Sequence, residues 1–218
     1  MTAARGRTRD AIVTAALELF REHGFEGTTM RAVADRAGVS VGNAYYYFSS
    51  KDELIQGFYD QLVAEHRALA LPELQGRTDL AERLLRTQRA WLTVAAPYRE
   101  FAGRFFAVAA QPGNPLSPFS PEASAAREAG VDLYRHVLDG AGGDVDRELA
   151  RELPGLLWLY HLGTVLFWVH DGSPGSARTH LLVERTAPIV ARLVRLSRLP
   201  VLRPLARQVV DVVRLLRD

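Results

Sequence analysis

The sequence predicts an all-α protein, and three features support this fold class. Apolar residues recur every three or four positions through most of the 218-residue chain, which is the pattern of helices with one buried face. We find no convincing alternation of polar and apolar residues, the pattern that would indicate a strand. Clusters of proline and glycine separate the periodic segments and mark turns between helices. The length permits one large domain, or a small domain joined to a medium one.

Two helices are predicted before residue 40. The first is expected to end at Gly24, because glycine readily leaves the helical conformation. Thr28 or Thr29 caps a short second helix, which Gly38 ends. The inward-facing positions are Ile12, Ala16, Leu19 and Phe20 in the first helix, and Met30, Val33 and Ala34 in the second.

Two further helices are predicted between residues 40 and 71. Ser40 caps the third helix. Ser50 and Glu53 have the spacing of a capping box, in which the two side chains accept hydrogen bonds from backbone N–H groups at a helix start. The fourth helix therefore begins near Ser50 and is expected to run to about Leu71, before Pro72. The apolar positions of the third helix are Ala44, Tyr45 and Phe48.

Longer helices are predicted in the rest of the chain. A proline-rich loop is expected at residues 111–121, and turns are expected at residues 139–144 and 171–175. The predicted helices are residues 79–96, 98–110, 122–138, 145–170 and 176–199, followed by an amphipathic helix over residues 201–216.

The net charge of +2 hides a gradient along the chain. Residues 1–51 carry six arginines and Lys51, the only lysine, against five acidic residues. Residues 52–191 carry 13 arginines against 18 acidic residues, and residues 192–218 carry seven arginines against two. An acidic middle between two basic ends indicates that these segments have separate functions.

Several classes of protein are disfavoured. The chain has no cysteine, so it can form no disulfide, thiolate nucleophile or cysteine-based zinc site. The most apolar stretch, residues 153–169, is short and interrupted by proline and glycine, which predicts a buried helix and not a transmembrane one. No signal peptide is expected. We therefore expect a soluble, cytoplasmic protein without a membrane partner.

No set of residues predicts an enzyme. The chain has no nucleophile elbow, phosphate-binding loop or H-E-x-x-H motif, and no cofactor is expected. Asp132, His136 and Asp139 share one face of a predicted helix, and their spacing is compatible with a metal. Acidic residues beside a surface histidine are far commoner, so we predict no metal site.

The most informative motif lies in residues 27–51. Two short helices flank the turn at residues 37–40, which is the spacing of a helix-turn-helix. Gly38 can adopt the positive φ that such a turn needs, and the small residues Ala34 and Ala37 let the helices cross closely. Because this motif cannot bury its apolar face alone, we expect the first and fourth helices to clamp it.

This motif offers groups that suit nucleic acid. Gly42 inside a helix costs about 1 kcal/mol relative to alanine, which indicates either close approach to another backbone or simple tolerance in the first turn. Three consecutive tyrosines cannot all face one core, so at least one hydroxyl is free to donate to a phosphate oxygen. Lys51 lies at a helix N-terminus, which itself attracts phosphate. We predict phosphate contacts from Thr28, Thr29, the tyrosines and Lys51, and base-edge contacts from Val41, Gly42, Asn43 and Tyr46.

The sequence resembles the TetR family of transcriptional regulators. The resemblance covers about residues 8–58, a quarter of the chain. The matching positions are Phe20, Gly24, Phe25, Thr28 and Thr29, the core at residues 33–40, and Gly42, Tyr45, Tyr46, Phe48, Lys51 and Leu54.

The resemblance implies a homodimer whose N-terminal domains enter the major groove of a palindromic, double-stranded DNA operator. It also implies a C-terminal domain that binds a small-molecule effector and thereby releases the DNA. We thus predict a three-helix helix-turn-helix DNA-binding domain over residues 1–51 and a helical ligand-binding and dimerisation domain over residues 52–218. By resemblance, the phosphate contacts are Thr29, Tyr45, Tyr47 and Lys51, and the groove-facing positions are Arg31, Ser40, Val41, Gly42 and Tyr46.

Two residues depart from the family pattern. Ala44 stands where a larger aliphatic residue is usual, so the recognition helix is expected to seat less firmly. Tyr47 stands where histidine is frequent, and its phenol can still donate to phosphate. Ala44 and the basic C-terminal segment leave an alternative open, namely a small-molecule-binding or membrane-peripheral helical protein with a vestigial helix-turn-helix.

The two basic ends of the chain each allow two interpretations. Arg5, Arg7 and Arg9 can lie along the DNA backbone or in the adjacent minor groove, or they can form a polar tail that is disordered without DNA. The C-terminal basic helix can lie on an anionic membrane, or its arginines can form the solvated face of a packed helix. We favour packing for the C-terminal helix.

The predicted C-terminal domain is rich in aromatic residues, some of which can line an apolar ligand pocket with few polar groups. Ordinary core is the alternative for any single aromatic. The candidate effector-binding residues are Trp91, Phe101, Phe105, Tyr134, Trp158 and His161.

The predicted helices at residues 145–170 and 176–199 carry apolar faces suited to dimerisation. Two helices from each subunit would form a four-helix bundle across a two-fold axis. Packing of the same faces within one chain is the alternative. The candidate dimer residues are Leu159, Leu162, Leu166, Val169, Leu182, Ile189 and Leu193.

Overall fold

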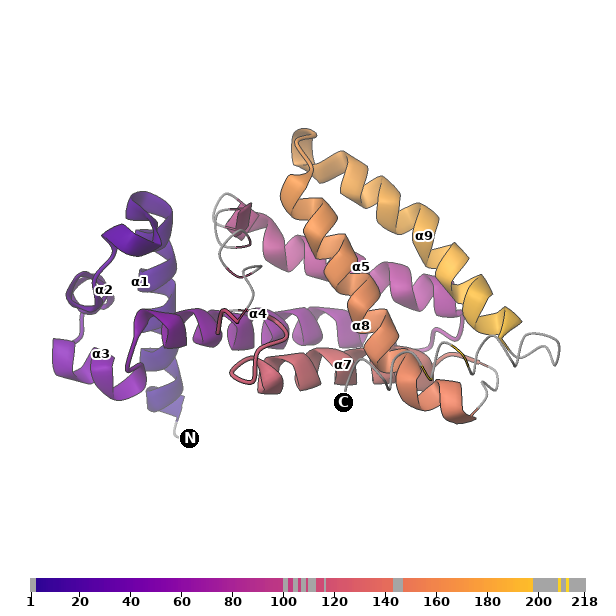
Figure 1. Ribbon diagram of the computed structural model, residues 1–218, viewed down its shortest axis with the longest axis horizontal. Coiled ribbons are helices and arrows are strands. Elements are labelled where there is room, and N and C mark those ends of the chain that lie inside the picture. Colours follow the sequence, from indigo (N-terminus) through magenta and orange to yellow (C-terminus); the bar gives the residue numbers. More distant parts are fainter. Residues whose placement is uncertain are drawn as a thin grey trace. The chain divides into compact units, whose positions relative to one another are not determined.

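The fold is entirely helical in the residues that the structure, a computed structural model, describes. Those residues contain helices and turns but no strand, which confirms the predicted all-α class (Figure 1). None of their helices combines the length and apolar character that crossing a bilayer requires. The described residues are 3–99, 102–103, 106, 109, 113–115, 117–142, 147–197, 208 and 211.

The chain divides into two compact units. The first unit comprises residues 1–64 and 96–127, and the second unit comprises residues 65–95 and 128–218. The helix that begins at Lys51 contributes residues to both units, so the chain does not change unit at the start of that helix. The boundary of a DNA-binding domain at residue 51 stays a prediction.

The N-terminal helices of the first unit follow the predicted order. They are α1 (Ala3–Gly27), α2 (Met30–Ala37), α3 (Val41–Tyr47) and the first part of α4 (Lys51–Glu73), and the short 3-10 helix η1 (Ala96–Tyr98) also belongs to this unit. Gly24 interrupts α1 with φ 77° and ψ 168°, as predicted. α4 continues past Pro72, beyond its predicted end, because a proline in the last turn removes only one of the final backbone hydrogen bonds.

The core of the first unit confirms nearly all of the predicted inward positions in α1, α2 and α3. Tyr45 is the exception, since it is 51% exposed, whereas Tyr47 packs partly buried against the core. On a helix, Tyr47 lies about 60° from Ala44 and Tyr45 about 100° from it. The prediction for Tyr45 was therefore wrong. The buried members are Ile12, Ala16, Leu19 and Phe20 of α1, Met30, Val33 and Ala34 of α2, and Ala44 and Phe48 of the α3 region.

The first and fourth helices clamp the end of α3, as the sequence predicts. A Cβ atom at Gly57 of α4 would lie 2.7 Å from Cε1 of Phe48 and 3.1 Å from Cγ2 of Val13 in α1. Any larger side chain at position 57 would have to displace Phe48, so this glycine allows the close packing that seats the C-terminal end of α3.

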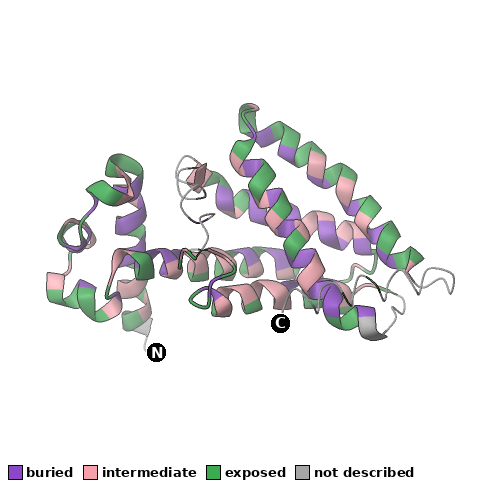
Figure 2. Cartoon of the chain, in the orientation of Figure 1, coloured by how far each residue is buried: buried purple, intermediate pink, exposed green. Residues whose placement is uncertain are grey.

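The helices of the second unit also agree with the sequence to within a few residues. Buried and exposed residues alternate along α9, which packs against α5 and α8 (Figure 2). The predicted helix at residues 98–110 lies mostly outside the described residues, and that at residues 201–216 lies outside them except at positions 208 and 211. The elements are residues 65–73 of α4, α5 (Leu80–Ala95), the larger part of α7 (Ser124–Asp139), α8 (Arg147–His170), the 3-10 helix η2 (Pro174–Ser176) and α9 (Ala177–Leu196).

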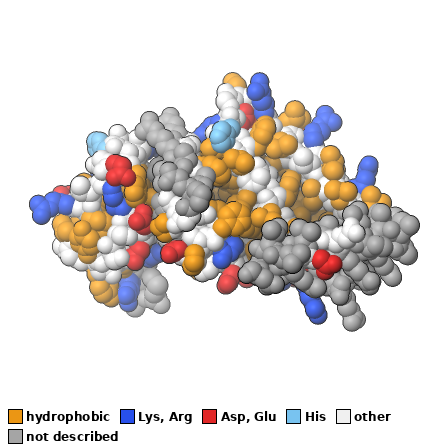
Figure 3. Space-filling model, in the orientation of Figure 1, with side chains coloured by type: hydrophobic (Ala, Val, Ile, Leu, Met, Phe, Trp, Pro, Cys, Tyr) orange, Lys and Arg blue, Asp and Glu red, His pale blue; other side chains and the backbone are white. Residues whose placement is uncertain are grey.

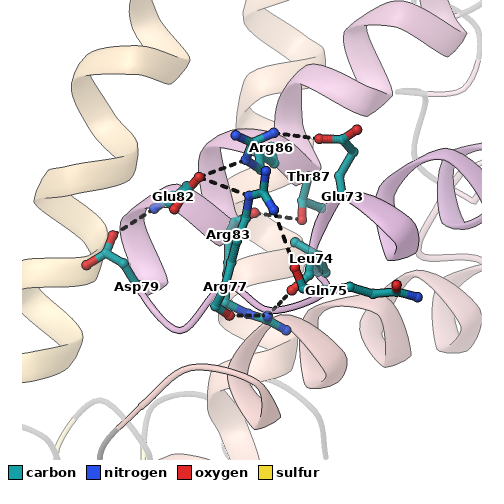
Figure 4. A network of polar contacts seen from close by, with 9 residues as sticks. All are labelled: Glu73, Leu74, Gln75, Arg77, Asp79, Glu82, Arg83, Arg86 and Thr87. Carbon is teal, nitrogen blue, oxygen red and sulfur yellow. Dashed lines mark hydrogen bonds and ion pairs between the residues drawn. The ribbon is translucent and has the colours of Figure 1, made fainter.

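A buried arginine joins the ends of two helices in the second unit, and Figure 4 shows its surroundings where the chain leaves α4. Arg83 of α5 donates to the carbonyl oxygens of Leu74 and Arg77, each at 2.7 Å, where the chain leaves α4. It also donates to those of His136 at 2.7 Å and Val137 at 2.8 Å, in the last turn of α7. A cation is favoured there because a helix C-terminus exposes partly negative carbonyl groups. Burial lowers the pKa of Arg83.

The turn between α8 and α9 depends on Asp171, which is 4% exposed. One carboxylate oxygen accepts from the backbone N–H and hydroxyl of Ser173, at 2.9 and 2.6 Å. The other accepts from the backbone N–H and hydroxyl of Thr179, at 2.9 and 2.7 Å. Burial acts to raise the pKa of Asp171, but these four hydrogen bonds favour the carboxylate and bring the net pKa below its usual value.

We predict that Asp171→Asn lowers the free energy of unfolding by about 2 kcal/mol at pH 7, because hydrogen bonds to an ionised group contribute about 1.5–3 kcal/mol. The folded-state pKa is lowered, so this contribution is complete above the unfolded-state pKa of about 3.9. It is lost as the pH falls through the folded-state pKa. Urea denaturation at a series of pH values measures the effect.

The difference between wild type and Asp171→Asn should therefore shrink as the pH falls from about 5 towards 2. Asp132→Asn is the matched control, since Asp132 is half-exposed on α7 and pairs with Arg135 on the surface. A difference that stays constant with pH would contradict the role assigned to the ionised Asp171.

Candidate functional site

The helix-turn-helix geometry is set by two capping residues and one glycine. Thr29 caps α2, and its hydroxyl oxygen accepts from the N–H of Ala32 at 3.1 Å. Gly38 has φ 68° and ψ 29°, and its N–H bonds back to the last turn of α2. Ser40 then caps α3 by accepting from the N–H of Asn43 at 3.1 Å. The predictions for Gly38 and Ser40 are confirmed, and of the two candidate threonines it is Thr29 that caps α2.

Thr28 does not fit the predicted role of a DNA contact. It is 2% exposed, and its hydroxyl donates to the carbonyl oxygen of Gly24 at 2.8 Å. This bond joins Thr28 to the residue at which α1 departs from helical geometry. Thr28 therefore stabilises the end of α1, and it is withdrawn from the predicted interface.

The outer face of α3 presents four residues to solvent. Gly42, Asn43, Tyr45 and Tyr46 are exposed, Tyr46 to 64%. A Cβ atom at Gly42 would meet no described atom within 4 Å, and Gly42 has no positive φ. Nothing in the described part of the chain therefore requires glycine at position 42.

The rest of the predicted interface surrounds this face. Thr29, Arg31 and Ser40 are exposed, and Val41 and Tyr47 are half-buried against the core. Ala44, which stands where the family pattern usually has a larger aliphatic residue, is fully buried in the core. α3 thus packs against the core through Ala44 and Phe48. Ala44 is therefore no longer a reason to consider the helix-turn-helix vestigial, and the basic C-terminal segment is the remaining reason.

The arginines before residue 10 lie within α1 and not in a tail. Arg5 donates to the hydroxyl of Tyr46 at 2.7 Å, and its guanidinium lies 5.2 Å from the centre of that ring. Arg9 pairs with Asp60 at 3.1 Å and lies over the ring of Phe48. Arg5 therefore adds positive charge beside the exposed face of α3, whereas Arg9 helps to hold α1 against α4.

Lys51 has an intramolecular role that the sequence did not reveal. Its ammonium group donates to the carbonyl oxygen of Phe25 at 2.7 Å and lies 4.4 Å from the centre of the Phe25 ring. It thus ties the start of α4 to the end of α1. Ser50 caps α4 as predicted, but Glu53 accepts from the N–H and hydroxyl of Ser49, one residue earlier than in a standard capping box.

Four of the six predicted effector-binding residues are buried in the second unit. The ring of His161 lies 5.2 Å from that of Trp91 and 5.9 Å from that of Tyr134. Trp158 shares a core cluster with Tyr134. Phe101 and Phe105 lie outside the described residues. Of the predicted residues, Trp91 and Tyr134 therefore lie against His161.

Sequence reasoning missed three members of this cluster. The ring of His66 stacks on that of His161 at 5.5 Å, Gln88 Oε1 lies 3.1 Å from His161 Nδ1, and Trp168 contacts Trp91 edge-on at 5.0 Å. Burial lowers the pKa of His66 to about 4 and that of His161 well below its usual value, so both rings are neutral at pH 7. Gln88 belongs to no recognised motif, so nothing in the sequence indicated that it would be buried in this cluster.

A pocket of about 310 Å³ lies elsewhere in the second unit, lined from α5, α7, α8 and α9. Its lining includes Asp79, Arg135, Asp139 and Arg195, and it contains none of the predicted effector residues. No group of three potential metal ligands occurs among the described residues. His136 Nδ1 instead lies 2.9 Å from the backbone oxygen of Asp132.

The predicted dimer residues lie on α8 and α9. Apolar side chains gather on the surface over these two helices (Figure 3). Leu159, Leu166, Ile189 and Leu193 are exposed, the last to 62%, while Leu162, Val169 and Leu182 are half-buried. Apolar exposure of this extent is typical of a protein interface.

These features define a helix-turn-helix protein with a separate helical unit that carries a buried aromatic cluster. Residues 12–57 match the family model described as "Bacterial regulatory proteins, tetR family", and residues 83–216 match "Tetracyclin repressor-like, C-terminal domain". The chain belongs to the TetR family of transcriptional regulators.

Individual relatives support this assignment. The transcriptional repressor KstR2 of Rhodococcus jostii is 36% identical over 83 residues, which are 36% of this chain and 41% of KstR2. The chain therefore covers less than half the length of this relative. A TetR regulator from Nitrosomonas europaea has a TM-score of 0.64 at 23% identity, over 84% of this chain and 97% of that one. The structure of FadR of Thermus thermophilus in complex with lauroyl-CoA has a TM-score of 0.54 at 26% identity. The match covers 82% of this chain and 92% of FadR.

We predict that Lys51→Met lowers the free energy of unfolding by about 1 kcal/mol, because it removes a charged donor from the carbonyl of Phe25. The matched control is Arg31→Met, since Arg31 is exposed and has no partner in the described part of the chain. Chemical denaturation measures both variants.

The control should leave the free energy of unfolding within about 0.5 kcal/mol of wild type, as is usual for an exposed side chain. Equal stability of Lys51→Met and wild type would contradict the role assigned to Lys51.

Proposed function

We propose that the chain is a dimeric transcriptional repressor that binds a palindromic operator and is released from it by a small, largely apolar molecule. The observation that carries this proposal is the outer face of α3. That face combines an exposed glycine, an exposed amide and two exposed phenols on a helix that is capped and clamped from behind. Such a surface suits the major groove, where side chains read base edges at close range.

The groups around α3 supply the contacts that position a protein on DNA. Thr29 and Ser40 cap helices through their oxygen atoms, so their hydroxyl hydrogens remain available to phosphate. Arg5, which contacts Tyr46, and the exposed Arg31 of α2 supply positive charge. In this proposal Tyr45 and Tyr47 donate to phosphate, and Val41, Gly42, Asn43 and Tyr46 face the bases.

Dimerisation is assigned to α8 and α9. Their exposed leucines and Ile189 give each subunit an apolar surface that a second copy of the chain would cover in a four-helix bundle. Two copies would place two recognition helices on two half-sites related by symmetry, which is why a palindromic operator is expected.

The effector is assigned to the aromatic cluster around His161. Apolar walls with a few polar groups are typical of ligand sites, and FadR of Thermus thermophilus binds the acylated molecule lauroyl-CoA. α4 supplies His66 to this cluster and Gly57 to the packing behind α3. An effector that moves α4 would therefore disturb the seat of α3. The proposal gives the chain no catalytic activity and places it in the cytoplasm with the DNA.

We predict that Gly42→Leu reduces operator affinity at least a hundredfold, because the new side chain would occupy the space that the DNA backbone and bases need. The free chain should be as stable as wild type, or about 0.5–1 kcal/mol more stable, because glycine disfavours a helix. Fluorescence anisotropy with a duplex enriched from genomic DNA by the wild-type chain measures the affinity.

Gly42→Ala serves as the control and should give an intermediate loss of affinity. Full affinity in Gly42→Leu would show that α3 does not approach DNA closely, and the proposed binding mode would have to be abandoned.

We predict that Leu193→Glu converts the dimer to a monomer at micromolar concentration, because a carboxylate would be buried without a partner in the interface. Analytical ultracentrifugation measures the change. The control is Arg195→Glu, which places the same carboxylate on the opposite side of α9 and should leave the dimer intact. If Leu193→Glu remains dimeric, α9 does not form the interface.

A further inference from the structure

Four polar side chains from four helices meet in the buried centre of the second unit. Gln88 and Tyr134 are at most 1% exposed, and His66 and His161 at most 8%. The ring of Trp91 contacts His161, and the ring of Trp168 packs against Trp91. Polar groups in such a place normally satisfy one another completely, so any atom left without a partner requires an explanation.

The hydrogen bonds in this cluster fix which atoms donate. His66 Nε2 lies 2.8 Å from the carbonyl oxygen of Thr87, which can only accept, so the neutral ring donates from Nε2. Gln88 Oε1 also only accepts, so His161 donates from Nδ1 at 3.1 Å. The amide oxygen of Gln88 is therefore already occupied, and the amide nitrogen is left to donate.

Two donors remain without an acceptor. Gln88 Nε2 and the Tyr134 hydroxyl are buried and have no hydrogen-bond partner in the part of the chain that the structure describes. Both belong to residues that contact the same ring, because Gln88 bonds to His161 and the Tyr134 ring lies 5.9 Å from it. Neither donor has an acceptor of the described residues within reach, the unprotonated ring nitrogens of the two histidines included, and both residues contact the ring of His161.

The charges around the cluster decide what kind of acceptor fits. Both histidines are neutral, and Arg67, the cation that acts on His66, donates to the carbonyl oxygen of Ala129 at 3.0 Å. No cation of the described residues donates a hydrogen bond into the cluster, so a buried carboxylate would keep a larger desolvation penalty than a neutral oxygen atom. A neutral oxygen atom carries a far smaller penalty and accepts from the same donors.

We infer that the ligand of this cluster is a neutral carbonyl compound whose oxygen accepts from Gln88 Nε2 and the Tyr134 hydroxyl, and whose apolar body packs against Trp91 and Trp168. That this ligand is the effector which releases the DNA depends on the proposed function. The binding site itself needs no DNA and can be tested in the free protein.

Intrinsic fluorescence provides the readout, because the three tryptophans of the chain are Trp91, Trp158 and Trp168, all in the second unit. The probes are 2-decanone and 2-methyl-1-decene, which have the same shape and differ in having C=O or C=CH₂. Wild type should bind the ketone at least fivefold more tightly than the alkene. Tyr134→Phe and Gln88→Leu should each reduce that preference to less than twofold by weakening ketone binding alone.

Tyr160→Phe is the matched control, since the Tyr160 hydroxyl bonds to Thr186 at 2.6 Å, outside the cluster. It should keep the ketone preference. Thermal denaturation separates binding from folding: Tyr134→Phe removes an unpartnered hydroxyl and should not lower the melting temperature, whereas Tyr160→Phe should lower it.

Equal affinity of wild type for ketone and alkene, including no binding of either, would overturn the inference. A ketone preference that survives both Tyr134→Phe and Gln88→Leu would do the same. If the chain prefers the ketone but enriches no DNA duplex, the proposed function is wrong and the inference about this ligand site still holds.

Discussion

The seating of a seven-residue helix is the constraint on which the DNA-binding unit depends. A helix as short as α3 is unstable by itself in water, and only one of its own residues, Ala44, is buried. Its other attachments lie at its ends, where Ser40 caps it and Phe48 packs closely over Gly57. Because so little of α3 faces inward, most of its surface is available to DNA.

α4 connects this seat to the rest of the molecule. Its first residues close the core behind α3, and Lys51 ties it to the end of α1. Further along the same helix, His66 takes part in the aromatic cluster of the second unit. The same helix therefore contributes residues both to the packing behind α3 and to the aromatic cluster.

Sequence spacing predicted the caps, turns and apolar faces, which depend on residues close together in the chain. It did not predict contacts between residues that are far apart in the chain. Gly38, Ser40 and the apolar faces of α1 and α2 follow from spacing within one or two turns. The sequence could not reveal that Lys51 would bond to Phe25, or that Gln88 would meet His161, because the partners are 26 and 73 residues apart. Thr28 was misassigned because its side chain is buried and its hydroxyl donates to the carbonyl oxygen of Gly24, which spacing alone does not show.

Photocrosslinking from position 46 would show whether the outer face of α3 lies against DNA bases. Tyr46 would be replaced by p-benzoylphenylalanine, and the chain would be irradiated with a duplex that wild type enriches from a random pool. We expect crosslinks to bases at two symmetry-related positions, one in each half-site, and none above background from the same group at Arg178, an exposed position on α9. Crosslinking at position 46 no greater than at position 178 would contradict the claim that the outer face of α3 reads DNA.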